Sequence, residues 1–158
     1  MPVNTKSVTG RRELHFTNLD EILADVERVA AGKHRMLGNW SLGQILWHLA
    51  KVMNGSIDGV PVRPGFIMRL IGPLMKRGFL AKSMPPGFQL PANFAKIFGP
   101  PETSVADGLR IFREAVARQK SDTHREPSPF LGKMTAEDYL RLHCRHAELH
   151  LSFVVPAE

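Results

Sequence analysis

The chain has 158 residues, of which 43% are hydrophobic and 23% charged, a composition typical of one soluble globular domain. Its single cysteine excludes an internal disulfide and a cluster of thiolate metal ligands. The formal net charge of +6 comes without a Lys/Arg-rich run or a nucleic-acid motif, so it is more typical of a solvated surface than of a site for nucleic acid, a membrane surface or an anionic substrate. Since there is no apolar leader and no stretch of ~18 apolar residues, we expect a cytoplasmic protein without a membrane span, and a homodimer stays open.

Two helices are predicted in the N-terminal third. The first follows the Thr17-Asn18 capping signal and ends at Gly32, with apolar residues at helical spacing between them. The second begins after Ser41, and Asn54-Gly55 supplies its stop signal.

Residues 61–101 differ in composition from the rest, because they hold eight of the twelve prolines. A long helix is not expected there. Pro64 favours a short helix that Gly72-Pro73 kinks or ends, and residues 78–101 are predicted to form an ordered loop. That loop contains too many aromatic and aliphatic residues for a disordered linker, so we expect it to lie against the helices.

Two more helices follow in the C-terminal third. Ser104 caps one that ends near Ser121, and Thr135 caps the last, with Asp138 completing a capping-box pattern and Phe153 at the predicted end. Four or five helices without an alternating strand pattern predict an all-α protein. We expect an antiparallel helix bundle, a single domain over residues 1–158, with 61–101 as a long Pro/Gly-rich insertion.

Three histidines share one side of the last predicted helix. At ~100° per residue, His146 and His150 lie ~40° apart on adjacent turns, and His143 falls within ~60° of both. Apolar residues flank this row, so the imidazoles face the core. Burial favours their neutral, metal-binding form, and two histidines one turn apart can bind one metal ion. Glu148 points the other way and is predicted to be a solvated surface residue.

A third ligand must come from another helix, and His48 is the best candidate because it borders the apolar face of the second predicted helix. His143 is interpreted as a fourth ligand, a donor that orients the site, or a hydrogen-bonded core residue. The alternative for the whole row is a set of ordinary core histidines bonded to carbonyls, to Tyr139 or to each other.

Two segments of the sequence resemble a known superfamily. Gly38-Asn39-Trp40-Ser41-Leu42-Gly43-Gln44-Ile45-Leu46-Trp47-His48-Leu49-Ala50 is similar to the second-helix signature of the DinB/YfiT-like superfamily, and His146-Ala147-Glu148-Leu149-His150 is similar to the last helix of an uncharacterised branch of it. The resemblance implies an up-down-down-up four-helix bundle with a zinc or nickel site at His48, His146 and His150. It also implies a metal-dependent thiol transferase or hydrolase. The chain departs from many members by lacking an Arg-Gly-Gln-like sequence after the last histidine.

Two kinds of function follow from these residues. A three-histidine site with an open position would activate water or a thiol, which favours a metal-dependent hydrolase or thiol S-transferase acting on a small molecule. A closed site would instead favour a non-catalytic, metal-stabilised interaction module. Apolar and basic residues around 66–80 could serve such a module as a surface for lipid or protein, although a stripe of this kind is more often core.

Overall fold

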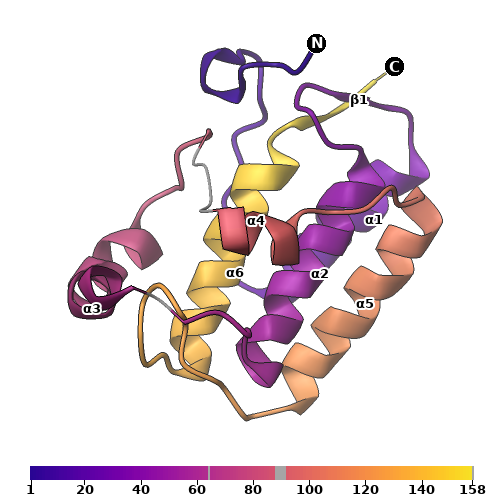
Figure 1. Cartoon of the computed structure of the whole chain (residues 1–158). Coiled ribbons are helices and arrows are strands. Elements are labelled where there is room, and N and C mark those ends of the chain that lie inside the picture. Colours follow the sequence, from indigo (N-terminus) through magenta and orange to yellow (C-terminus); the bar gives the residue numbers. More distant parts are fainter. Residues whose placement is uncertain (64, 88–91, 158) are drawn as a thin grey trace.

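The computed structural model describes residues 1–63, 65–87 and 92–157. Figure 1 shows a mainly helical chain, as the sequence predicts. After the short 3-10 helix η1 (Thr5–Ser7), the elements are α1 (Leu19–Ala31), β1 (His34–Met36), α2 (Leu42–Asp58), α3 (Phe66–Ala81), α4 (Ala92–Phe98), α5 (Val105–Ser121), α6 (Ala136–Leu151) and β2 (Val154–Pro156). Within the described part of the chain, every helix is too short or too polar to cross a lipid bilayer.

Four helices begin at the capping residues that the sequence predicts. In each, the side chain accepts a hydrogen bond from the backbone N–H of the third helical residue, which satisfies a donor that the helix itself leaves unpaired. The capping residues of α1, α2, α5 and α6 are Asn18, Ser41, Ser104 and Thr135. The reciprocal bond of a full capping box is also present in α2 and α6.

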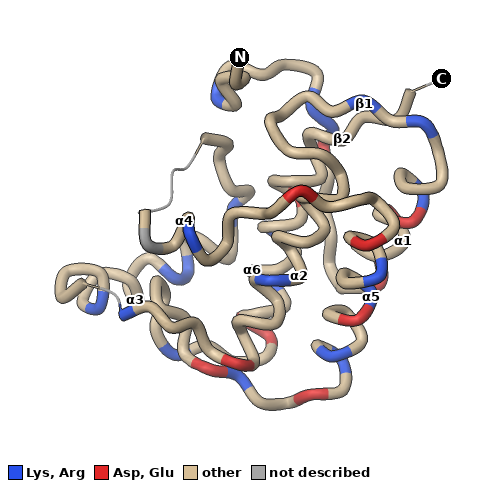
Figure 2. The backbone as a smooth tube through the Cα atoms, turned by 45° about the vertical axis from the view of Figure 1, so that its right-hand side comes forward, with Lys and Arg blue, Asp and Glu red and all other residues tan. Residues whose placement is uncertain are grey.

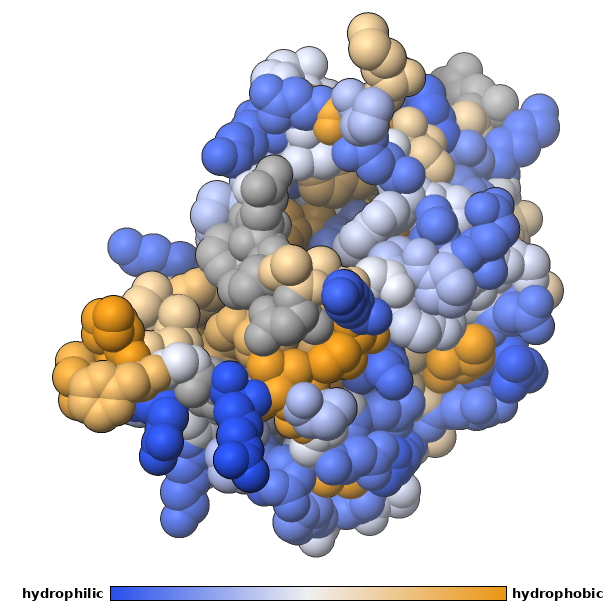
Figure 3. All heavy atoms as spheres, viewed as in Figure 1, coloured by the Kyte–Doolittle hydropathy of each residue, from blue (hydrophilic) through white to orange (hydrophobic). Residues whose placement is uncertain are grey.

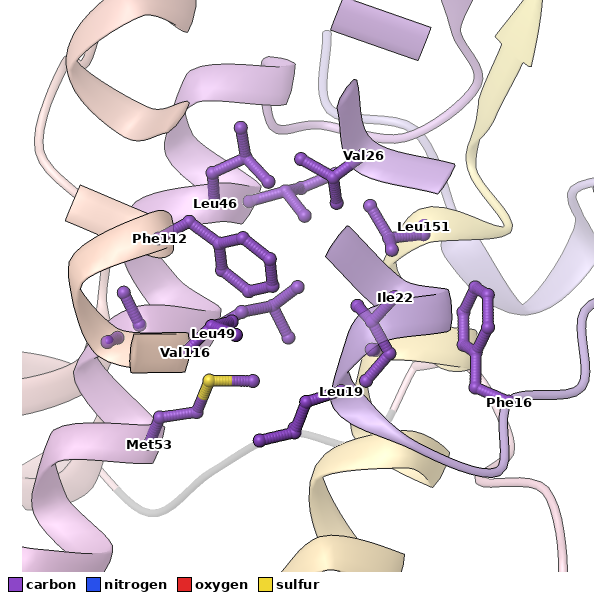
Figure 4. Close-up of a cluster of buried hydrophobic side chains, with 14 of the residues drawn as sticks. Phe16, Leu19, Ile22, Val26, Leu46, Leu49, Met53, Phe112, Val116 and Leu151 are labelled. Carbon is purple, nitrogen blue, oxygen red and sulfur yellow. The ribbon is translucent and has the colours of Figure 1, made fainter. Parts of the chain in front are cut away.

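The main core lies between these four helices. Figure 4 shows side chains from α1, α2, α5 and α6 that meet there, with Phe112 of α5 among aliphatic residues of α1 and α2. Ile22, Leu46 and Phe112 are fully buried. Since burial of one such side chain contributes about 1.5–3 kcal/mol, this cluster is the main source of stability for the helices that carry the histidines.

The crossing of α2 and α5 depends on two glycines. A Cβ atom added to Gly43 would lie 2.2 Å from the carbonyl oxygen of Thr103, and one added to Gly108 would lie 2.7 Å from the carbonyl oxygen of Gly43. Only a residue without a side chain allows the two backbones to approach so closely. This contact fixes the start of α2, five residues before His48.

A small sheet joins the connection between α1 and α2 to the C-terminal segment. β1 and β2 pair antiparallel, with Arg35 opposite Val155. The sequence analysis predicted no strand, because segments of three residues are too short to show alternation. It also continued the last helix to Phe153, which is wrong, since α6 ends at Leu151 and the chain turns into β2.

The predicted loop at residues 78–101 is wrong in part. α3 continues through Pro73 to Ala81, and α4 occupies much of the remainder, while residues 88–91 lie outside the described residues. Tertiary contacts explain the longer helix: Gly72 lies against the carbonyl oxygen of Phe130, where a Cβ would not fit, and Lys76 donates to Asp138 at 2.9 Å. These contacts hold α3 together despite its internal proline.

The stop predicted at Asn54-Gly55 is also wrong. α2 runs on to Asp58 and ends at Gly59, whose φ of 78° lies in the left-handed region that glycine adopts without strain. Gly55 stays within the helix, where an added Cβ would lie 3.1 Å from Val60. Close packing rather than a turn therefore accounts for this glycine.

Candidate metal centre

His48, His146 and His150 come together from α2 and α6, as predicted. The Nε2 atom of His146 lies 3.1 Å from Nε2 of His48 and 3.0 Å from Nε2 of His150. Each residue offers one nitrogen, and the three nitrogens lie within 4.8 Å of one another. Two nitrogens bound tetrahedrally to one ion at 2.0–2.1 Å would stand about 3.4 Å apart, so this spacing fits a common cation.

A carbonyl oxygen fixes the tautomer of His48. Its Nδ1 atom lies 2.7 Å from the carbonyl oxygen of Phe98, the last residue of α4. Because a carbonyl oxygen can only accept, the proton of the neutral ring must be on Nδ1. The Nε2 atom of His48 therefore presents a lone pair to the other two histidines, which is the form that binds metal.

The proton count in this cluster favours a cation over a set of core histidines bonded to each other. Since Nε2 of His48 can only accept, His146 must donate its Nε2–H to make that contact a hydrogen bond. The same single N–H would then have to serve His150 as well. One divalent ion between the three nitrogens satisfies all three lone pairs at once.

Burial keeps the three rings neutral. It lowers the pKa of His146 and His150 well below the usual value of 6.5, and the neighbouring histidines lower the pKa of His146 further. Burial also lowers the pKa of His48, partly offset by its bond to Phe98. A proton therefore competes weakly with a metal ion at neutral pH.

Trp40 is a site residue that the sequence analysis named only within the superfamily signature. Its ring stacks on His150, with centroids 5.3 Å apart and an interplanar angle of 15°, and it also contacts His48 at 4.9 Å. The tryptophan immediately precedes the Ser41 cap of α2, so the helix start positions it. It covers one side of the cluster and restrains both imidazole rings.

The cluster keeps some contact with solvent. His48 is buried, whereas His146 and His150 are partly exposed. Figure 3 shows a hollow in the surface above the position of α4 in Figure 1, near the C-terminal end of α6. Two of the three histidines therefore remain in contact with solvent.

His143 lies outside the group of three. Its side chain is 2% exposed, its Nε2 atom has no hydrogen-bond partner within the described residues, and its ring stacks on Tyr139. It lines a cavity of about 360 Å³ near the start of α1 and the end of α5. The structure therefore places it as a buried core residue rather than beside the other three histidines.

The chain can be assigned to a family at this point. A family model described as a protein of unknown function, DUF1569, matches residues 8–157. The chain belongs to this family. Comparisons with curated proteins and with solved structures found no match. The match covers all seven histidines of the chain, so the candidate metal centre lies wholly within the family's domain.

In this DUF1569 chain, Glu148 is not the surface residue that the sequence predicts. It is 5% exposed, accepts a hydrogen bond from the backbone N–H of Phe16 at 2.7 Å, and pairs with Arg145 at 2.7 Å. The helical angle was correct, since Glu148 does point away from the metal ligands. The N-terminal segment around Phe16, however, covers that side of α6.

The remaining candidates stay outside the centre. Burial raises the pKa of the Cys144 thiol to about 11, so it is a poor nucleophile at neutral pH. His15 and His124 are exposed, and His34 is partly exposed in β1. Within the described residues, the group that could hold the ion contains three histidines and no carboxylate.

Proposed function

We propose that the chain binds one divalent metal ion, zinc or nickel, through His48, His146 and His150, and acts as a metal-dependent hydrolase or thiol transferase on a small molecule. The observation that carries the proposal is the convergence of three Nε2 atoms on one point while Phe98 holds the His48 proton on the far nitrogen. Three neutral ligands with two partly exposed rings are typical of an open, catalytic coordination sphere.

The side chains around the proposed metal ion have two roles, binding the ion and orienting its ligands. His48, His146 and His150 hold the ion, and Trp40 fixes the orientation of two of their rings. A bound divalent ion lowers the pKa of a water or thiol ligand, so that a nucleophile is available near pH 7. The described group holds no carboxylate, so a proton released there would have to pass to solvent on the partly exposed side of His146 and His150.

We also propose that α1, α2, α5 and α6 form the DinB-like up-down-down-up bundle that the sequence resembles. Support comes from the contacts, since α1 packs on α5 and α6, and α2 packs on the same two helices. The long connection between α2 and α5, which contains α3 and α4, is where that topology requires a crossover.

Metal analysis tests the binding part of this proposal. Protein purified without an affinity tag should contain one zinc or nickel ion per chain, and His146→Ala or His150→Ala should lower that content strongly, because each removes one of three ligands. His124→Ala, at an exposed histidine, is the matched control. Equal metal content in all three variants would place the ion elsewhere.

Activity tests the catalytic part. The metal-loaded protein should turn over simple esters or amides if it is a hydrolase, or thiol adducts if it is a transferase. A chelator should abolish the turnover, and zinc or nickel should restore it. A protein that holds its metal but has no activity in either assay would favour the alternative, a metal-stabilised interaction module.

A further inference from the structure

The net charge of the chain is concentrated in one segment. Residues 59–101 hold six Lys and Arg residues and no Asp or Glu, whereas the remainder of the chain holds 15 of each. The segment therefore carries the whole formal charge of +6. Figure 2 shows basic residues without acidic ones along α3 and α4, and mixed charges along α1 and α5.

The same segment exposes a large apolar surface. α3 presents apolar side chains to solvent along its length, and Figure 3 shows them as a protruding hydrophobic ridge at the side of the molecule where α3 lies in Figure 1. The four most exposed side chains of this ridge are Phe66 (80%), Ile67 (70%), Leu70 (66%) and Leu74 (81%). Soluble domains rarely leave so many adjacent large apolar side chains in water.

The helix docks on the domain by its opposite side, so it cannot bury this ridge itself. Gly72 and Leu80 are its buried residues, and Lys76 bonds to Asp138 of α6. The exposed residues recur three and four positions apart and so form one continuous face of α3. Something outside the described chain must cover that face or be recruited to it.

Most basic side chains next to the ridge form no ion pair within the described residues, so they can contact an anionic partner. Within the described residues, Lys76 is the one basic residue of the segment that forms an ion pair. The others are exposed and lie on α3, on α4 or beside them; they are Arg63, Arg69, Arg77, Lys82 and Lys96. A helix with an apolar face bordered by basic residues is the arrangement that lies in the interface of an anionic membrane.

We propose that α3 is a membrane-surface docking helix, which inserts its apolar face among the acyl chains of an anionic phospholipid bilayer while Arg69, Arg77 and Lys82 contact the headgroups. The long arginine and lysine side chains can reach the headgroup level from the edge of the ridge. The helix lies on the bilayer and does not cross it, since its length and polarity exclude a span.

A second copy of this chain is a poorer occupant. A two-fold dimer through the ridge would place two acid-free basic segments against each other, and this repulsion opposes association at moderate salt. A bilayer that contains phosphatidylserine supplies the opposite charge and an apolar phase together.

The experiment is flotation of the purified full-length chain with vesicles of phosphatidylcholine alone or with about one third phosphatidylserine. Binding should require phosphatidylserine and weaken as salt rises. The double variant Arg69→Gln with Arg77→Gln should bind about thirtyfold more weakly, at about fivefold per basic residue. Arg110→Gln with Arg113→Gln removes the same charge from exposed positions on α5 and should bind as the wild type does.

Two further variants test insertion. Leu70→Gln with Leu74→Gln changes exposed positions, so it should fold normally and yet lose more than tenfold in vesicle binding. A tryptophan in place of Leu74 should shift its emission to the blue on anionic vesicles. No binding to anionic vesicles, equal binding by the leucine double variant, or a solution dimer that the leucine variant disperses would each overturn the proposal, the last in favour of a second copy.

Discussion

At the scale of single residues, His143 has an environment that disfavours charge. Its ring is 2% exposed, and its Nε2 atom has no partner among the described residues. Burial lowers its pKa to about 3, with a smaller contribution from Arg125. The residue is therefore neutral in the folded protein and must gain a proton on unfolding in mild acid.

This difference predicts acid sensitivity that a substitution should reduce. The pKa of histidine in an unfolded chain is about 6.5, so the stability contributed by neutral His143 is complete above that pH and is lost as the pH falls toward 3. Between pH 7 and pH 5 the loss is about 2 kcal/mol. In His143→Leu, the fall in the free energy of unfolding over this range should be smaller by that amount.

Urea denaturation at pH 7 and pH 5 measures the free energy of unfolding of both proteins. A chelator is present so that metal release does not contribute to the difference. His124→Leu removes an exposed imidazole and is the control. A fall as steep in His143→Leu as in the wild type would mean that His143 is not a buried neutral group.

Residue patterns predicted the three histidines of the candidate centre but not their surroundings. His146 and His150 are one turn apart, and His48 borders the apolar face of α2, so helical spacing alone predicted where they point. The stacked ring of Trp40 and the carbonyl of Phe98 depend on how distant segments pack. Spacing within one helix carries no information about such contacts.

At the scale of elements, α4 has a function that its composition concealed. Its last residue, Phe98, accepts the Nδ1 proton of His48 and so keeps the metal-binding tautomer in place. Prolines and glycines around it predicted a loop, whereas the structure forms a short helix whose aromatic residues Phe94 and Phe98 are buried. Burial of these side chains overrides the weak local preference.

Breaking α4 should therefore weaken metal binding without removing a ligand. Lys96→Pro at an exposed position places a proline ring against the carbonyl of Ala92 and displaces Phe98. Loss of such an orienting hydrogen bond typically costs 10–100-fold in metal affinity. Lys96→Ala keeps the helix and is the control. Competition with a fluorescent zinc chelator measures both, and equal affinities would show that the Phe98 carbonyl does not orient His48.

The elements with strong end signals were predicted well. α1, α2, α5 and α6 combine a capping residue with an apolar stripe, so their starts follow from the sequence. Their ends were less certain. The Asn54-Gly55 pair, for example, is typical of a helix end but lies inside α2, where Gly55 packs closely against Val60. β1 and β2 form because the segment between α1 and α2 meets the C-terminal segment, and a three-residue segment cannot predict that.

At the scale of the whole molecule, an average overall composition concealed an uneven distribution of charged and apolar residues over the surface. The sequence analysis interpreted +6 as the charge of a solvated surface. It did not note that segment 59–101 has no acidic residue and therefore carries all of the net charge. Residues 78–101 were expected to lie against the helices, and Leu80, Phe94 and Phe98 are buried there. Apolar residues such as those around 66–80 are more often part of a core. α3 instead leaves most of them in water, because only the narrow side around Gly72 meets the domain.

The metal centre also couples distant parts of the fold, because His48 and His146 are 98 residues apart in the chain. An ion bound at this point links α2 to α6, and it has no such set of ligands once the chain is unfolded.

Metal should therefore stabilise the folded protein by mass action, by about 2.7 kcal/mol when free zinc is a hundred times its dissociation constant. For a domain of this size, 1 kcal/mol raises Tm by about 2–4 °C, so the expected rise is about 5–10 °C. Scanning calorimetry across a zinc titration should show Tm increasing steadily with the logarithm of free zinc in the wild type and in His124→Ala. His146→Ala should lose nearly all of the increase, since only His48 and His150 then remain to hold the ion. An equal increase in His146→Ala would mean that zinc stabilises the protein from another site, and the three histidines would then have to be reinterpreted as core residues that share a proton.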